Sequence, residues 1–439
     1  MTEVSAAGPY PLPDVTMQTW IVRYDQDGSC CSPETREACI DAVAASGDRP
    51  VILFSHGWNN DFNDATDLYR RFLVEFEKVQ QKHPLKGGEP MFIGVTWPSI
   101  WLPLEKGPKM SADPTGAFDG AAKSIADTIT DPTDRARFHG LIGSSSLNLQ
   151  DARDLARLLS GILQTGNDEG PPVAAADEAN MLEAFKAIEE LEPGEDYDDI
   201  DRIRRVDGPG TRQPREAAAA GYSLDPKNIL RLASLYLMKG RAGTVGSKGV
   251  SSLVADILGR TKASLHLVGH SFGCKVLLSA LAENNPPPRK IGSILLLQPA
   301  ISHLAFADTI PGRDGPGAYR TAFAMVERPI FCTYSAHDFP LHGVYHHAMA
   351  RRKDVGEIRS AASKTSAGAP PNNYAALGGY GPRTSGEQLL DPIPNVGEPH
   401  NVDETALIVG LDGSAGRRID GHGGVANVYT AWALRAQMT

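Results

Sequence analysis

The sequence predicts an α/β fold built on a mainly parallel sheet, and three observations lead to this prediction. Short continuous apolar runs, such as residues 50–55 and 291–297, are typical of strands buried on both faces of a parallel sheet. Segments with helical spacing alternate with these runs, as the crossover connections between parallel strands require. The composition of the 439-residue chain, 41% hydrophobic and 22% charged, is that of a globular protein.

The regular alternation begins near the N-terminus. Residues 91–97 form a continuous apolar run that Pro98 stops, because proline cannot donate to a strand ladder. We expect strands at 20–24, 50–55 and 91–97, separated by helices at 34–45 and 64–82. The second of these helices carries its apolar residues on one stripe, as expected for a helix that covers a sheet: Leu68, Phe72, Leu73, Phe76 and Val79.

The alternation is interrupted at residues 100–225, which are rich in Gly, Pro, Ala and charged residues. Helices are expected at 150–164 and 178–192. Between Asp177 and Asp201, eleven acidic residues accompany a single basic residue. This run favours a solvated helix face and loop over an acidic docking or cation site, since it lacks the full pattern of a calcium loop.

Regular order returns after residue 225. Helices are expected near 227–239 and 248–260, and then at 271–283 and 425–436. The remaining strands of the predicted sheet are expected at 264–268, 291–297, 329–335 and 406–411.

Length alone suggests two or three domains. However, much of the Gly and Pro content (44 and 32 residues) lies in a few irregular stretches. We therefore predict one domain at 19–439 that follows an N-terminal arm at 1–18. This domain is expected to contain an insertion at about 100–225 and a long loop at about 352–400.

Composition also excludes several classes of protein. The net charge of −10 argues against nucleic-acid binding, which relies on a basic face. No apolar run approaches the length of a membrane span, so no transmembrane segment is expected. Residues 1–14 lack the basic and apolar regions of a signal peptide. We therefore expect a cytoplasmic protein, although export without a signal peptide stays open.

The cysteines are few, odd in number and not in a metal-binding spacing. Cys274 and Cys332 lie in apolar stretches and are expected to be buried thiols. Three free thiols at Cys30, Cys31 and Cys39 are favoured over a disulfide between Cys39 and one of the other two.

The strongest motif is Gly269-His270-Ser271-Phe272-Gly273, which matches G-x-S-x-G. The pattern alone is weak, but here it directly follows a predicted buried strand and directly opens an apolar helix. A nucleophile elbow requires this strand–turn–helix context. The turn exposes the serine Oγ at a helix N-terminus, where the dipole and the free N–H groups favour negative charge.

A serine nucleophile needs a base, and the base needs an orienting acid. In this architecture the chain order is Ser, Asp or Glu, then His. Asp338 follows the predicted strand at 329–335 and is assigned as the acid. The alternative is that Asp338 is only a surface turn residue. Among the twelve histidines, His422 follows the last strand in a Gly-flanked loop. We assign His422 as the base and keep His400 as the alternative.

An oxyanion hole needs two N–H donors. Phe272, directly after the serine, is expected to supply one from its backbone. The loop His56-Gly57-Trp58-Asn59, after an early strand, is expected to supply the other from the Trp58 N–H. The His56 side chain is expected to brace this loop.

These residues together resemble the α/β-hydrolase superfamily. The similarity is greatest to a poorly characterised bacterial branch with a His-Gly-Trp-Asn loop and a Trp-Pro-Ser motif, found here at 56–59 and 97–99. The matching pieces, at 50–100, 260–300, 325–345 and 405–435, cover less than half of the chain. The resemblance implies the α/β-hydrolase fold, with the insertion as a possible cap over the site.

The triad and the oxyanion hole imply acyl transfer to water through an acyl-enzyme, without a metal or an organic cofactor. The expected activity is that of a carboxylesterase or lipase acting on a small-molecule or lipid ester. A phospholipase, thioesterase or amidase with the same triad is the alternative within enzymes. A catalytically silent fold that acts as a binding module is the alternative from another class. The sequence leaves the oligomeric state open.

Overall fold

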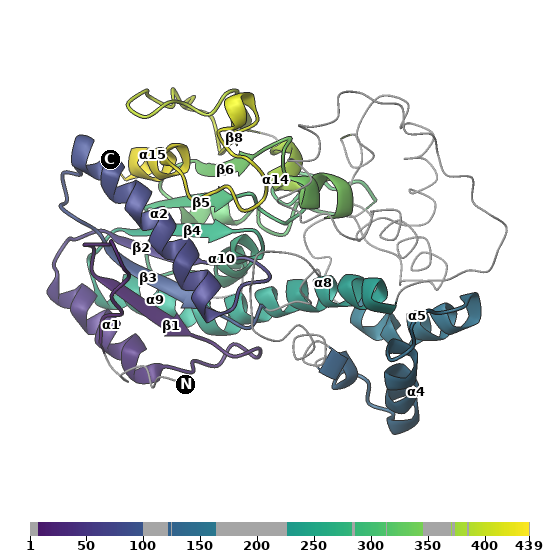
Figure 1. Ribbon diagram of the computed structural model, residues 1–439. Helices are drawn as coiled ribbons and strands as arrows, with labels where there is room; N and C mark the ends of the chain where they lie inside the picture. Colours follow the sequence, from purple (N-terminus) through teal and green to yellow (C-terminus); the bar gives the residue numbers. More distant parts are fainter. Residues whose placement is uncertain are drawn as a thin grey trace.

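The structure is a computed structural model, which describes residues 8–99, 122–123, 125–163, 226–282, 286–312, 314–345, 370, 374–383 and 386–438. Within these residues eight strands form one sheet, in which every pair of neighbours is parallel (Figure 1). The strand order is β1-β3-β2-β4-β5-β6-β8-β7. The strands are β1 (Thr19–Arg23), β2 (Val51–Ser55), β3 (Met91–Thr96), β4 (Leu265–His270), β5 (Ser293–Leu297), β6 (Ile330–Tyr334), β7 (Glu387–Leu390) and β8 (Ile408–Asp412).

Helices connect and cover the strands, and they are labelled here as in Figure 1. A π-helical segment, Val245–Val250, joins α8 to α9. The α-helices are α1 (Pro33–Ala45), α2 (Phe62–Lys82), α4 (Pro132–Ile142), α5 (Leu149–Leu163), α8 (Pro226–Thr244), α9 (Ser251–Arg260), α10 (Phe272–Ala282), α11 (Ala322–Met325), α14 (Leu377–Tyr380) and α15 (Val428–Gln437).

The sheet divides the apolar core into two layers, because side chains alternate between the faces of a strand. On β2, for example, Leu53 packs into one layer and Phe54 into the other. The first layer lies under α1, α8, α9 and α10, and the second lies under α2 and α15. Burial on both faces explains why the central strands are continuous apolar runs.

Helix α2 begins where its sequence provides a cap. The Asp61 carboxylate accepts the Asp64 N–H, and the Asp64 carboxylate accepts the Asp61 N–H in return. This reciprocal pair satisfies backbone donors that a helix start leaves open. The helix then runs across the sheet beside α15 (Figure 1).

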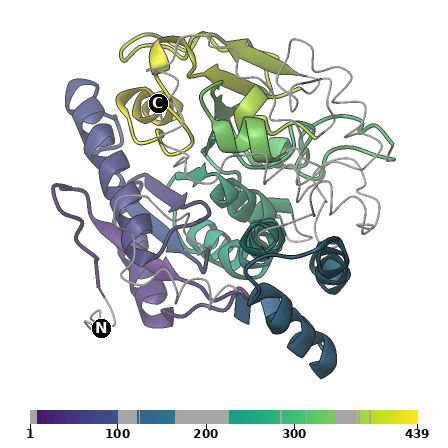
Figure 2. The ribbon, with the colours of Figure 1, turned by 45° about the vertical axis from the view of Figure 1, so that its right-hand side comes forward.

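Helices α4 and α5 lie away from the sheet. α8 packs on α10 and continues outward, and α5 packs against α8 in turn. Figures 1 and 2 show α4 and α5 together at the outer end of α8. Helix α8 therefore links the described helices of the predicted insertion to α10.

The expected strands are confirmed in the expected order, and the following elements differ from the prediction. The helices predicted at 227–239 and 248–260 form one continuous helical run. Helix α4 and the short helices α11 and α14 were not predicted. Strand β7 lies in the segment that was predicted as a loop. The strand was not predicted because its four partly exposed residues carry little periodic signal. Of the predicted N-terminal arm, residues 8–18 are described, and Leu12 and Met17 in this stretch are buried. The acidic helix at 178–192 lies outside the described residues.

None of the helices in the described part of the chain is long and apolar enough to cross a membrane. All five cysteines are free thiols, and Cys274 and Cys332 are buried, as predicted.

Candidate active site

Ser271 occupies the sharp turn between β4 and α10 with its backbone in the left-handed region, at φ 54°. A non-glycine residue in this conformation costs on the order of 1–3 kcal/mol, so the surrounding structure must enforce it. The Ser271 N–H donates to the Leu297 carbonyl of the neighbouring strand at 3.0 Å. The turn that the motif predicts is therefore present and tied to β5.

Two glycines allow the turn to form. A Cβ added to Gly57 would lie 2.6 Å from the Ser271 Cβ, and one added to Gly273 would lie 2.0 Å from the Ser55 carbonyl oxygen. Side chains at these positions would therefore drive apart the turn and the end of β2. Glycine is required here for close approach rather than for a special backbone angle.

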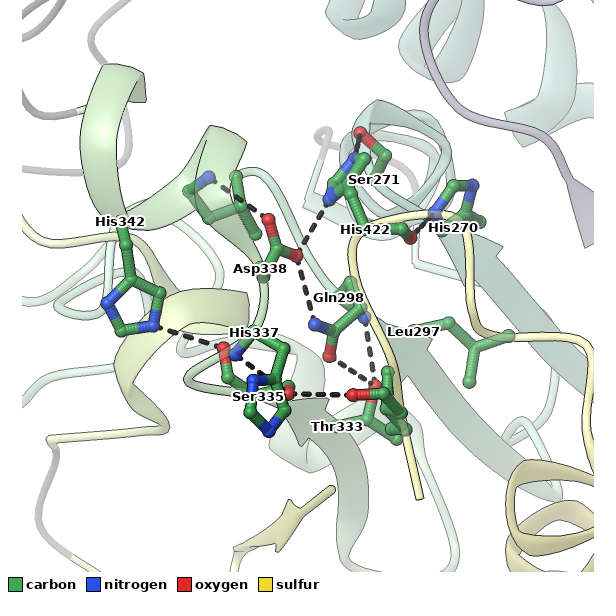
Figure 3. Close-up of polar contacts among 12 residues, drawn as sticks. His270, Ser271, Leu297, Gln298, Thr333, Ser335, His337, Asp338, His342 and His422 are labelled. Carbon is green, nitrogen blue, oxygen red and sulfur yellow. Dashed lines mark hydrogen bonds and ion pairs between the residues drawn. The ribbon is translucent and has the colours of Figure 1, made fainter. Parts of the chain in front are cut away.

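Ser271, His422 and Asp338 form a continuous hydrogen-bonded chain (Figure 3). The Ser271 hydroxyl is 2.8 Å from His422 Nε2, and His422 Nδ1 is 2.8 Å from Asp338 Oδ2. The three residues follow β4, β8 and β6. Because all strands are parallel, their carboxyl ends meet at one edge of the sheet, where sites in such folds form. The structure thus brings together the three residues predicted from sequence.

Asp338 is fully buried, and its carboxylate is held by two further donors. The Gln298 Nε2 donates to Oδ2 at 2.9 Å, and the Leu341 N–H donates to Oδ1 at 3.1 Å. Thr333 fixes Gln298 in turn, because its hydroxyl donates to Gln298 Oε1 at 3.1 Å and accepts the Gln298 N–H at 2.9 Å. These contacts fix the carboxylate oxygen that faces His422.

Sequence reasoning missed Gln298. Its backbone is also left-handed, at φ 43°, and its side chain is buried. The feature that could have indicated Gln298 is its place as a polar residue directly after the apolar run of β5. This strand is the neighbour of β4, which Ser271 follows. Nothing in the sequence pairs that residue with Asp338, forty positions later.

His270 contacts the loop that carries His422. Its Nε2–H donates to the His422 carbonyl oxygen at 2.9 Å, and the two rings lie 5.0 Å apart. Burial, and then the neighbouring His422, lower the pKa of His270 to about 3. His270 therefore stays neutral while it contacts the base.

His56 braces the loop after β2, as predicted. Its Nδ1–H donates to the Gly57 carbonyl at 2.8 Å, and its Nε2 accepts the Trp97 N–H at 3.2 Å. The Trp97 indole N–H donates to the His56 carbonyl oxygen at 3.2 Å, and the two rings stack. The Ser99 hydroxyl accepts the Asn60 N–H at 3.2 Å. The two motifs that carry the family resemblance therefore pack on each other.

Phe272 and Trp58 lie beside the serine. Phe272 is the first residue of α10, so its N–H has no partner within the helix. The Trp58 ring lies 6.5 Å from the Phe272 ring, and the loop before it touches Ser271 at Gly57. Phe272 therefore adjoins Ser271 at the start of α10, and the Trp58 ring lies beside Phe272.

His400, the alternative base, lies elsewhere. It packs between Phe331, at the start of β6, and Trp432, on α15. Since β6 runs from this point towards Asp338, His400 lies at the opposite edge of the sheet from Ser271. Among these two histidines, His422 is the one in contact with the serine.

Within the described residues no group of three or more His, Cys, Asp or Glu side chains is arranged to hold a metal ion. Comparisons of the chain with models of protein families, with curated proteins and with solved structures give no match.

Replacing Gly273 by Ala is expected to destabilise the protein by about 1–3 kcal/mol, because the new methyl group overlaps the backbone of β2. Gly240→Ala is the matched control, since nothing lies within 4 Å of a Cβ there and alanine favours a helix. Urea unfolding measures both changes. Equal stability of the two variants would contradict the crowding described for the turn.

Stability is expected to fall as the pH drops from 7 to 5. Burial lowers the pKa values of His56, His266 and His400 to about 4, and that of His270 to about 3. Below pH 6.5 these histidines are protonated in the unfolded chain but stay neutral in the folded protein. Each of them therefore lowers the free energy of unfolding by about 2 kcal/mol by pH 5.

The free energy of unfolding in urea, measured at several pH values, tests this expectation. His266→Gln should reduce the pH dependence, whereas the same change at exposed His139 should leave it intact. A wild-type stability that is flat between pH 7 and pH 5 would show that the buried histidines are not held neutral.

Proposed function

We propose that the protein is a serine hydrolase of the α/β-hydrolase fold that cleaves carboxylic esters through an acyl-enzyme. The observation that carries the proposal is the 2.8 Å contact of the Ser271 hydroxyl with His422 Nε2, in a chain that ends on buried Asp338. A nucleophile, a base and an orienting acid in this order are the requirements for covalent acyl transfer. The strained turn at Ser271 supports the proposal, since such strain clusters at functional sites.

In the first half of the reaction, Ser271 Oγ attacks the ester carbonyl carbon and His422 Nε2 takes its proton. The imidazolium that forms is held through Nδ1–H by the Asp338 carboxylate. The carbonyl oxygen becomes an oxyanion, and the N–H groups of Phe272 and Trp58 are proposed to donate to it. The tetrahedral intermediate then expels the alcohol, which receives the proton from His422.

In the second half, His422 takes a proton from a water molecule, and the resulting hydroxide attacks the acyl-enzyme carbonyl. The second tetrahedral intermediate releases the carboxylic acid, and Ser271 recovers its proton from His422. His270 and Gln298 contribute by holding the loop of the base and the acid in place.

The insertion at 100–225 is proposed as a cap that shapes substrate choice. Its described part supports this only indirectly, through the packing of α5 on α8 and of α8 on α10. An ester of a small molecule or a lipid is the proposed substrate. A cytoplasmic location stays a prediction from the sequence.

The proposal predicts that a fluorophosphonate probe labels the protein at Ser271. Ser271→Ala should abolish labelling, because the probe reacts with the activated hydroxyl. Ser144→Ala, at the exposed end of α4, is the matched control and should label like the wild type. Labelling is read by fluorescence after electrophoresis and mapped by mass spectrometry.

Two results would count against the proposal: a wild-type protein that does not react, or a Ser271→Ala protein that reacts as fast. Hydrolysis of matched esters, thioesters and amides then separates an esterase from a thioesterase or an amidase. A labelled serine without turnover of any of these would favour the binding-module alternative.

A further inference from the structure

A cavity of about 600 Å³ lies at the amino-terminal edge of the sheet, opposite the candidate active site. It is formed by the end of α2, the start of β6, residues 399–402 and the end of α15. The cavity is within the usual size range of pockets that hold small organic molecules. No step of the proposed reaction uses it.

The charged residues that line this cavity are all basic or histidine. Lys82, Arg328 and Arg435 lie around it, and no Asp or Glu of the described residues is part of its lining. Arg435 is buried and donates to the carbonyl oxygens of His83 and Pro84, at 2.5 and 2.7 Å. It forms no ion pair with a carboxylate in the described part of the chain, so its charge is not neutralised there.

His400 gives the cavity a buried polar group without a partner. The residue is only 6% exposed, and neither ring nitrogen makes a hydrogen bond with any described residue. Buried polar groups are nearly always paired, and an unpaired one is costly. A ligand that accepts the imidazole N–H would satisfy the donor of this ring.

The walls beside His400 are flat and apolar. The Phe331 ring lies 5.2 Å from the His400 ring, and the Trp432 ring stacks at 6.4 Å with an angle of 29°. Pro84, Pro329 and Pro399 add further apolar surface. Such walls favour an apolar or aromatic body, while the basic groups favour a negative charge.

We propose that this cavity is a second binding site, which takes an organic carboxylate with an apolar or aromatic body. The carboxylate accepts from the His400 imidazole and lies among Lys82, Arg328 and Arg435, and the body packs against the apolar wall formed by Pro84, Pro329 and Pro399. Binding here goes beyond the proposed hydrolase activity and does not depend on it.

The test uses 2-naphthoate as the probe and 2-naphthamide as its uncharged match, with isothermal titration calorimetry on the full-length protein. We expect one naphthoate per chain and at least about tenfold weaker binding of naphthamide, since a hydrogen bond to a charged group is worth that much. Ser271→Ala should bind naphthoate as the wild type does, which separates this site from the candidate active site.

Two variants locate the binding. His400→Phe keeps a ring in the stack but removes both nitrogens, and Lys82→Gln removes a charge on an exposed helix end where folding is not at risk. Both should weaken naphthoate binding, His400→Phe by about tenfold, whereas His139→Phe on α4 should not. Unchanged affinity in both variants, equal affinity for naphthamide, no detectable naphthoate binding, or its loss in Ser271→Ala would each overturn the proposal.

Discussion

The left-handed backbone of Ser271 is the constraint on which the rest of the candidate site depends. This one residue reverses the direction of the chain between the end of β4 and the start of α10. The serine hydroxyl therefore faces the loop after β8. The strain is enforced by packing, because β2 and its loop press against the turn at Gly273 and Gly57. The sheet order places β2 and β5 on either side of β4, and both contribute to holding the turn.

The groups around the serine divide into those that react in the proposed mechanism and those that hold them. Asp338, Gln298 and Thr333 form one buried network that fixes the acid from the strands β5 and β6. His270 and His56 form the other support, from β4 and β2. Both histidines stay neutral because burial lowers their pKa values, so His270 adds no positive charge beside His422. Rigid elements thus present the reacting atoms, which is the arrangement that preorganised catalysis requires.

The elements that could be predicted from sequence are those with a local physical signal. Continuous apolar runs locate the buried strands, and the glycines on both sides of Ser271, between a strand and a helix, locate the turn. Asp338 and His422 could be predicted because parallel strands bring their carboxyl ends to one edge. Gln298 could not, since its role arises from a contact between side chains far apart in the sequence. Strand β7 was missed because a short edge strand has no buried face to mark it.

The central claim is that Asp338, acting through His422, activates Ser271. The rate of inactivation by a fluorophosphonate tests it in Asp338→Asn, since the amide leaves the shape of the site unchanged but does not hold the imidazolium. The account predicts a rate lower by about 10³–10⁴-fold, as for loss of the acid in a Ser-His-Asp triad. Asp308→Asn, in an exposed ion pair with Arg320, serves as the control and should keep the wild-type rate. An Asp338→Asn protein that folds and reacts as fast as the wild type would contradict the account.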